Sequence, residues 1–166
     1  SHPLAALELA EAIATSDVPG GVVNIITGYR RELAPTLAAH MDALGLVGPG
    51  FTAAHGVWLD DEDMKRLAGR GASVAHNPGS NMRLGSGIAD MRRLLECGIN
   101  VGIGTDGASS SDNLNMYEAM RIASLASKVR GPDWERWITT REVLEAGTTG
   151  SARALGFDKL GRLAPG

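Results

Sequence analysis

Three side chains that could carry acid–base or metal chemistry lie where predicted β-strands end. His55 and His76 each lie at or beside the carboxyl end of an apolar run, and Asp106 directly follows a third run. The carboxyl ends of parallel strands meet at one edge of a sheet, so we expect the three side chains to converge there. Histidine and aspartate suit a divalent metal such as zinc, and they also suit proton transfer near neutral pH.

The simpler interpretation of each residue remains open. A single histidine in a strand, such as His55 or His76, is more often a structural residue than a ligand. A strand, a histidine and a helix occur twice here, and a strand that ends in Asp106 follows. This order favours a functional site over three unrelated residues.

The elements that must position these side chains alternate along the chain. We expect strands at 22–26, 51–59, 72–76 and 99–105, and helices at 4–15, 30–42, 60–70, 88–97, 114–129, 133–138 and 139–154. Alternation of this kind predicts a parallel sheet with right-handed crossovers. A closed (β/α) barrel needs eight strands and about 250 residues. The sequence therefore predicts an α/β fold, a half TIM-type barrel of about four parallel strands, which self-association as a homodimer would complete.

Composition excludes several classes of function. The chain has 166 residues, of which 43% are hydrophobic and 21% charged, with a net charge of −3. It has no basic run and no apolar stretch of the roughly 20 residues that a membrane helix needs, so we expect neither nucleic acid nor a membrane as partner. The single cysteine, Cys97, suits a reducing cytoplasm, where we expect the protein to act.

Three motifs surround the candidate side chains. They are Ala53–Leu59 (AAHGVWL), Ala75–Gly87 (AHNPGSNMRLGSG) and Gly102–Gly107 (GIGTDG). In this order, the motifs resemble the amidohydrolase superfamily, and most closely its nucleobase deaminase and chlorohydrolase branch. The resemblance extends over residues 44–166.

The resemblance implies a fold and a set of roles. The three strands would be the last three of an eight-stranded barrel, and a zinc ion or another divalent metal would activate water. Asp106 would bind the metal and carry a proton, and His55 would orient or protonate the reacting group. His76, Asn81 and Ser86 would lie on the substrate side. The substrate would be a small heterocycle with a cyclic amidine, such as guanine, adenosine or a triazine.

The sequence also departs from the family pattern. The family uses a His-x-His pair on its first strand and a further histidine from its fifth strand. This chain has four histidines, His2, His40, His55 and His76, and no His-x-His pair. Catalytic zinc normally has three protein ligands. We therefore expect that this chain alone does not bind metal tightly and is inactive alone.

The first 43 residues resemble a different family from the rest of the chain. Leu9–Gly28, Glu32–Pro35 and His40–Asp42 resemble a segment of the coenzyme domain of an aldehyde dehydrogenase, although no GxGxxG phosphate-binding motif is present. The sequence therefore predicts two segments, 1–43 and 44–166, that together form one continuous folded unit, as in a chimera or a fragment.

Three functions follow as alternatives. The chain is part of an amidohydrolase that hydrolyses or deaminates cyclic amidines, or it is a structural chimera without activity, or it retains NAD binding from a dehydrogenase. The first is favoured for ancestry, and the second for the behaviour of the isolated chain. The third is the weakest because the phosphate-binding turn is absent.

Overall fold

The structure is a computed structural model that describes residues 39–163. The chain divides into two compact units, Ser1–Ala43 and Leu44–Gly166. In the first unit the described residues, 39–43, are helical. The helix predicted at 4–15, the strand at 22–26 and most of the helix at 30–42 lie outside the described residues. The other three predicted strands belong to the second unit.

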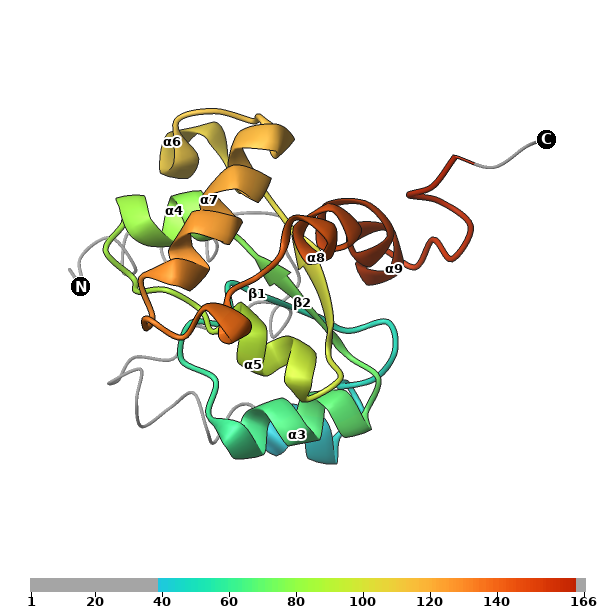
Figure 1. Cartoon of the computed structure of the whole chain (residues 1–166). Helices are drawn as coiled ribbons and strands as arrows, with labels where there is room; N and C mark the ends of the chain where they lie inside the picture. Colours follow the sequence, from blue (N-terminus) through green and yellow to red (C-terminus); the bar gives the residue numbers. More distant parts are fainter. Residues whose placement is uncertain (1–38, 164–166) are drawn as a thin grey trace, which may run out of the picture. The chain divides into compact units, whose positions relative to one another are not determined.

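A three-stranded parallel sheet forms the centre of the second unit (Figure 1). Its strands are β1 (Thr52–Ala54), β2 (Ser73–His76) and β3 (Asn100–Ile103), in the order β1-β2-β3. Val74 of β2 pairs with Ala53 on one side and Val101 on the other. The α/β class and the parallel direction predicted from the sequence are confirmed.

The strands are shorter than predicted, most of all at β1. The expected strand 51–59 ends at Ala54 because the next two residues, His55 (φ 69°) and Gly56 (φ 62°), adopt left-handed backbone conformations. Such conformations cannot continue a strand. The third strand ends at Ile103, before the loop that leads to Asp106. Both candidate residues therefore stand just beyond their strands.

Two crossover helices join the strands in sequence. Helix α3 (Asp61–Gly69) follows β1, and α5 (Met91–Glu96) precedes β3. The Asp60 side chain accepts hydrogen bonds from the backbone N–H groups of Glu62 and Asp63, which caps α3 at its amino end. The acidic run at 60–63 is thus a helix start, as predicted.

Two short helices were not predicted. Helix α4 (Pro78–Arg83) directly follows β2, and α6 (Ala108–Ser111) follows Asp106. The Asn77-Pro78-Gly79 sequence favoured a turn. Proline is nevertheless well tolerated in the first turn of a helix, because the N–H groups there have no carbonyl partner within the helix. Helix α4 carries Asn81, one of the candidate residues.

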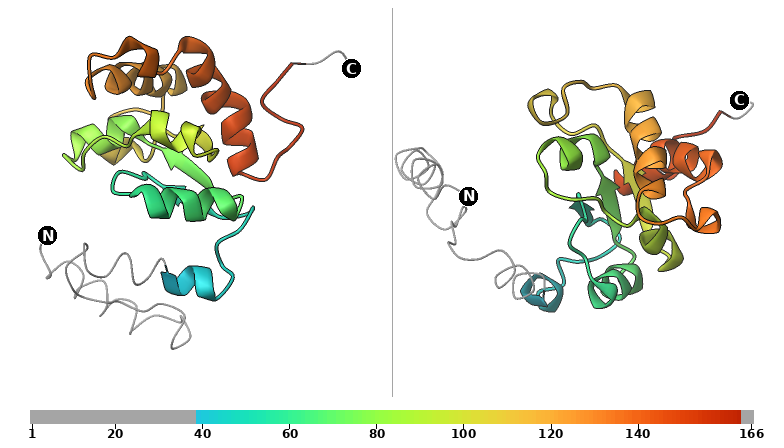
Figure 2. Two further views of the ribbon diagram at one scale, coloured as in Figure 1. Left: turned by 60° about the horizontal axis from the view of Figure 1, so that its bottom comes forward. Right: turned by 60° about the vertical axis from the view of Figure 1, so that its left-hand side comes forward.

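The remaining elements are helical. They are α7 (Met116–Lys128), a 3₁₀ turn η1 (Trp134–Arg136), α8 (Thr140–Glu145), a π-helical turn η2 (Ala146–Gly150) and α9 (Ser151–Ala154). The helix predicted at 139–154 is confirmed, with a π-helical turn inside it, whereas the helix predicted at 133–138 is only a 3₁₀ turn. In Figure 2, right, α7 and α8 lie beside the strands.

The π-helical turn brings the chain against β3. Ser151 Oγ accepts a hydrogen bond from the backbone N–H of Ile103 (3.1 Å) and lies 2.9 Å from the carbonyl oxygen of Ala146. Gly150 lies so close to Val101 that a side chain at this position would meet the strand carbonyl. The sheet and this helix are therefore in direct backbone contact.

The core is built from small and medium aliphatic side chains. Val74 and Leu94 have no exposed surface, and Val101 and Ile103 are almost fully buried. Burial on both faces is expected for a parallel sheet. Within residues 39–163, no helix has both the length and the hydropathy of a membrane-spanning segment.

Candidate functional site

The carboxyl edge of the sheet brings His55 and Asp106 together. His55 Nε2 lies 3.8 Å from Asp106 Oδ2, beyond hydrogen-bond distance but close enough for a proton-carrying group to bind both. Their side chains are 41% and 32% exposed, so both are accessible to a ligand. We refer to these two residues as the His55–Asp106 pair.

Both members of the pair have unusual backbone conformations. His55 has φ 69° and Asp106 has φ 60°, in the left-handed region that side chains disfavour. A residue with a side chain costs about 1–2 kcal/mol there. The His55 N–H donates to the carbonyl oxygen of Ala75 (2.8 Å), which holds the turn. Strain of this kind is typical of functional sites, and it supports a functional interpretation of the pair.

The Asp106 carboxylate is held by hydrogen bonds at both oxygens. Ser80 Oγ donates to Oδ2 (2.6 Å), and the backbone N–H of Gly107 donates to Oδ1 (2.8 Å). The Ser80 hydrogen bond is the largest cause of a lowered pKa for Asp106, with further contributions from Gly107, Ser110 and the charge on His55. Asp106 is therefore an ionised carboxylate at neutral pH, and it can accept a proton.

The other ring nitrogen of His55 contacts Asn81. His55 Nδ1 lies 2.8 Å from Asn81 Oδ1. Asn81 is 1% exposed, and its amide nitrogen is buried without a hydrogen-bond partner among the described residues. The substrate contact that the resemblance implied for Asn81 stays a prediction, whereas its contact with His55 is part of the structure.

His76 lies beneath the surface at the end of β2. It is 1% exposed, and its Nδ1 atom is buried without a hydrogen-bond partner among the described residues. Burial, and to a lesser extent the charge on His55, lowers the pKa of His76 to about 4. His76 is therefore neutral under ordinary conditions. Its implied place on the substrate side also stays a prediction.

Ser86 follows α4, where its backbone N–H donates to the carbonyl oxygen of Asn81 (2.8 Å). No described contact joins its side chain to the His55–Asp106 pair.

Ser80, which contacts Asp106 directly, was not predicted from the sequence. The one available signal was Pro78, because proline is frequent at the first position of a helix and a helix here would place Ser80 just beyond β2.

The donors of the pair do not complete a metal site. His55 Nε2 and Asp106 Oδ2 could supply two ligands, whereas catalytic zinc normally has three. Residues 39–163 contain no group of three or more histidine, cysteine, aspartate or glutamate side chains placed to hold a metal. The described part of the chain therefore does not fit a complete metal centre.

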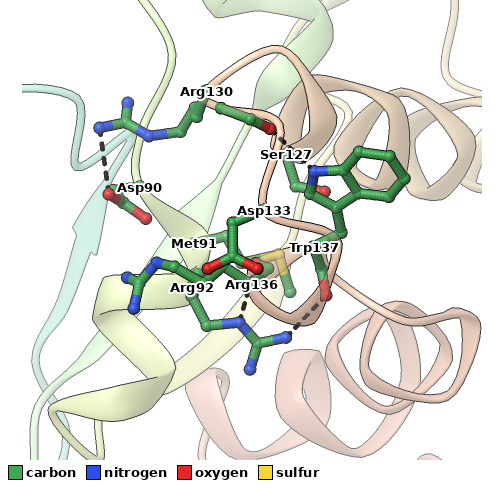
Figure 3. Close-up of a pocket in the computed structure, with 9 residues that line it drawn as sticks. Asp90, Met91, Arg92, Ser127, Arg130, Asp133, Arg136 and Trp137 are labelled. Atoms are coloured by element: carbon green, nitrogen blue, oxygen red, sulfur yellow. Dashed lines mark hydrogen bonds and ion pairs between the residues drawn. The ribbon is translucent and has the colours of Figure 1, made fainter.

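A separate hollow of about 150 Å³ lies beside the start of α5 (Figure 3). Arg92, Arg130 and Arg136 line it, and each guanidinium is paired with a carboxylate. Their partners are Glu142 (2.7 Å), Asp90 (3.0 Å) and Glu96 (3.0 Å), in that order. Because these charges are already neutralised and none belongs to the pair, we assign the hollow no chemistry.

The described unit is an α/β fold with a parallel sheet, and a histidine and a carboxylate lie together at the carboxyl edge of that sheet. Residues 12–166 match the Amidohydrolase family, and the chain belongs to this family.

Characterised relatives include several deaminases. The chain is 43% identical over 143 residues to 5'-deoxyadenosine deaminase of Methanothermobacter thermautotrophicus, covering 86% of this chain and 33% of the relative. It is 50% identical over 129 residues to 5-methylthioadenosine/S-adenosylhomocysteine deaminase of Desulforudis audaxviator, covering 77% of this chain and 30% of the relative. The chain thus spans about a third of the length of these relatives.

Solved structures show the same likeness. A mutant of atrazine chlorohydrolase from Arthrobacter aurescens, in complex with zinc and atraton, has a TM-score of 0.77 and 29% identity, covering 100% of this chain and 38% of that one. An adenosine deaminase from Xanthomonas campestris with bound zinc has a TM-score of 0.73 and 32% identity, covering 97% of this chain and 33% of that one. Both likenesses are to zinc-containing enzymes with TIM-type barrels.

The predicted aldehyde dehydrogenase segment is not borne out. The family match begins at residue 12 and continues without a change of family at residue 43. The helix-strand-helix pattern expected over 4–42 is shared by many α/β layers, so it did not discriminate between the two families. A compact unit does end at Ala43, but its sequence match is to the amidohydrolases.

Proposed function

We propose that the chain forms part of the active site of a hydrolase that deaminates or hydrolyses cyclic amidines in small heterocycles, with adenosine-type nucleosides as the favoured substrates. The observation that carries the proposal is the His55–Asp106 pair, which joins an ionised carboxylate and an imidazole at 3.8 Å on the carboxyl edge of the sheet. Relatives that deaminate 5'-deoxyadenosine and 5-methylthioadenosine support the choice of substrate.

The chemistry of the pair suits this reaction. The oxygen of water adds to the ring carbon, and the bond from that carbon to the exocyclic amine breaks, so that a ring carbonyl, a ring N–H and ammonia form. One proton of water goes to the ring nitrogen, and the other goes to the departing amine. Asp106 accepts the proton released by water and returns it to the departing amine, which is a general base and then a general acid role. His55 contributes a second polar contact to the group that reacts between it and Asp106.

A test of this proposal uses a graft. The matching segment of the Methanothermobacter 5'-deoxyadenosine deaminase is replaced by residues of this chain, and ammonia release from 5'-deoxyadenosine is measured. We expect the graft to be active and Asp106→Asn to reduce its turnover by about 10²–10⁴-fold, since the carboxylate that moves the proton is lost. A folded, zinc-loaded graft without activity would contradict the proposal.

The metal and the assembly of the isolated chain form a second part of the proposal. Two donors hold zinc weakly, so we propose that this chain alone does not retain it and has no turnover. We further propose that open sheet edges lead to a homodimer. We also propose a cytoplasmic location, which the single cysteine supports.

One experiment measures both properties. After incubation with zinc and gel filtration, we expect light scattering to give a dimer mass and elemental analysis to give less than one zinc per chain. Asp106→Asn should lower the zinc content further without changing the mass. A stable monomer would contradict the assembly, and stoichiometric zinc would contradict the weak-site interpretation. Ammonia release from 5'-deoxyadenosine by the isolated chain would contradict the proposal that it has no turnover alone, and also the alternative that it is an inert structural unit.

A further inference from the structure

We propose that Ser80 and Asn81, two consecutive residues of α4, are positioning residues, of which Asn81 fixes the tautomer and orientation of His55 and Ser80 fixes the carboxylate of Asp106. The proposal rests on the proposed function in assigning a reaction to the pair. The contacts themselves do not depend on it.

The position of α4 directly after the middle strand of the sheet explains how one helix reaches both His55 and Asp106. Helix α4 follows the middle strand β2, whereas His55 follows β1 and Asp106 follows β3, the strands on either side. Adjacent residues of a helix point about 100° apart. Ser80 is therefore directed to one neighbouring strand end and Asn81 to the other, across 26 residues of sequence in each case.

Burial makes these contacts rigid and limits what else they can do. Ser80 is 0% exposed and Asn81 is 1% exposed, whereas the His55 side chain is 41% exposed. A buried side chain loses little further entropy when it holds its partner, and it cannot easily bind a ligand that approaches from solvent. Both residues therefore act through the His55–Asp106 pair.

The Asn81 contact selects one protonation pattern on His55. Asn81 Oδ1 can only accept a hydrogen bond, so the neutral imidazole must carry its hydrogen on Nδ1. The lone pair then lies on Nε2, which faces Asp106 Oδ2. With this tautomer Nε2 can accept a proton or hold a group that donates one, which is what a reacting centre between the two residues needs.

The Ser80 contact selects one orientation of the carboxylate. Ser80 Oγ and the Gly107 N–H each hold a different oxygen of Asp106, so the carboxylate cannot rotate freely. Oδ2, the oxygen nearest to His55, carries the Ser80 hydrogen bond. Helix α4 thus sets both halves of the pair with two hydrogen bonds.

The test measures the tautomer in the full chain without any substrate. Two-dimensional ¹H–¹⁵N spectra of the ¹⁵N-histidine-labelled protein above pH 7 report which ring nitrogen carries hydrogen, and His55→Gln assigns the signal among the four histidines. We expect hydrogen on Nδ1 of His55. Asn81→Ala should shift His55 toward the Nε2–H form that free histidine prefers, and Asn81→Asp should restore the Nδ1–H form because a carboxylate also accepts.

Controls separate positioning from a general loss of structure. Met82→Ala changes the next residue of α4, which is 44% exposed, and should leave the tautomer unchanged. If Asn81→Ala does not fold, Asn81→Leu, which has a similar size and cannot accept a hydrogen bond, gives the same measurement. Ser80→Ala should change the ¹³C chemical shift of the Asp106 carboxylate at pH 7, because the hydrogen bond to Oδ2 is lost. Hydrogen on Nε2 of His55 in the unsubstituted chain, or an unchanged tautomer in folded Asn81→Ala, would overturn the proposal. An inactive graft would instead count against the proposed function.

Discussion

Acidification from about pH 6.5 to about pH 4 is expected to remove about 3 kcal/mol of folding stability through His76 alone. Burial lowers the pKa of His76 from 6.5 to about 4 in the folded protein. The unfolded chain binds the proton first, at its ordinary pKa near 6.5, and this favours unfolding as the pH falls. Each unit of difference corresponds to about 1.4 kcal/mol. The full contribution is present above pH 6.5.

The measurement is the free energy of unfolding in urea at a series of pH values, compared with His76→Leu. This variant has no titrating group at the site, so the difference between the two proteins should change by about 3 kcal/mol between pH 7 and pH 4. Glu142, with a pKa lowered to about 2, loses its contribution only below its ordinary pKa of 4.5, and it does so in both proteins. Parallel pH profiles would contradict the buried, neutral state of His76.

Gly150→Ala is expected to destabilise the fold by about 3 kcal/mol, the upper end of the usual cost of overpacking. A β-carbon on Gly150 would meet the carbonyl oxygen of Val101 and would also approach the carbonyl oxygen of Glu145 at 3.2 Å. The obstacle is backbone on both sides and not a side chain that can turn away. The strand and the π-helical turn must therefore separate.

Gly69→Ala is the matched control for this substitution. Gly69 ends α3, has no left-handed backbone, and leaves open space of at least 4 Å around the position that a β-carbon would take. Alanine there should stabilise the protein by about 0.5–1 kcal/mol, since it restricts the unfolded chain. Urea unfolding followed by tryptophan fluorescence compares the two variants. Equal effects of both substitutions would show that the contact with Val101 is not tight.

Much of the fold was predictable because local chemistry decides it. The acidic start of α3, the aliphatic strands and the order of strands and helices follow from short-range patterns. The length of β1 does not follow from such patterns. The left-handed backbone of His55 ends this strand, and that conformation depends on the tertiary structure. Helix α4 was not predicted because Pro78 is typical of a turn as well as of the first turn of a helix.

The position of the candidate residues at strand ends was predictable, and their contacts were not. The spacing of His55 and Asp106 placed both at strand ends, and the structure brings them to 3.8 Å. The contact of Asn81 with His55 depends on α4 and on the neighbouring order of β1 and β2. Ser80 gave no signal of its own, since a serine that follows Pro-Gly is most simply a turn residue.

Because of the π-helical turn η2, the number of residues in Ala146–Gly150 cannot change without disturbing the contact with β3. A π-helical turn contains one residue more than the α-helical turn that it replaces. Deletion of any residue in Ala146–Gly150 would restore an α-helical turn and rotate α9 by about 100° relative to β3. Ser151 would then face away from the N–H of Ile103 that it now binds. Related sequences that keep this contact should therefore keep both the length of the segment and the glycine at position 150.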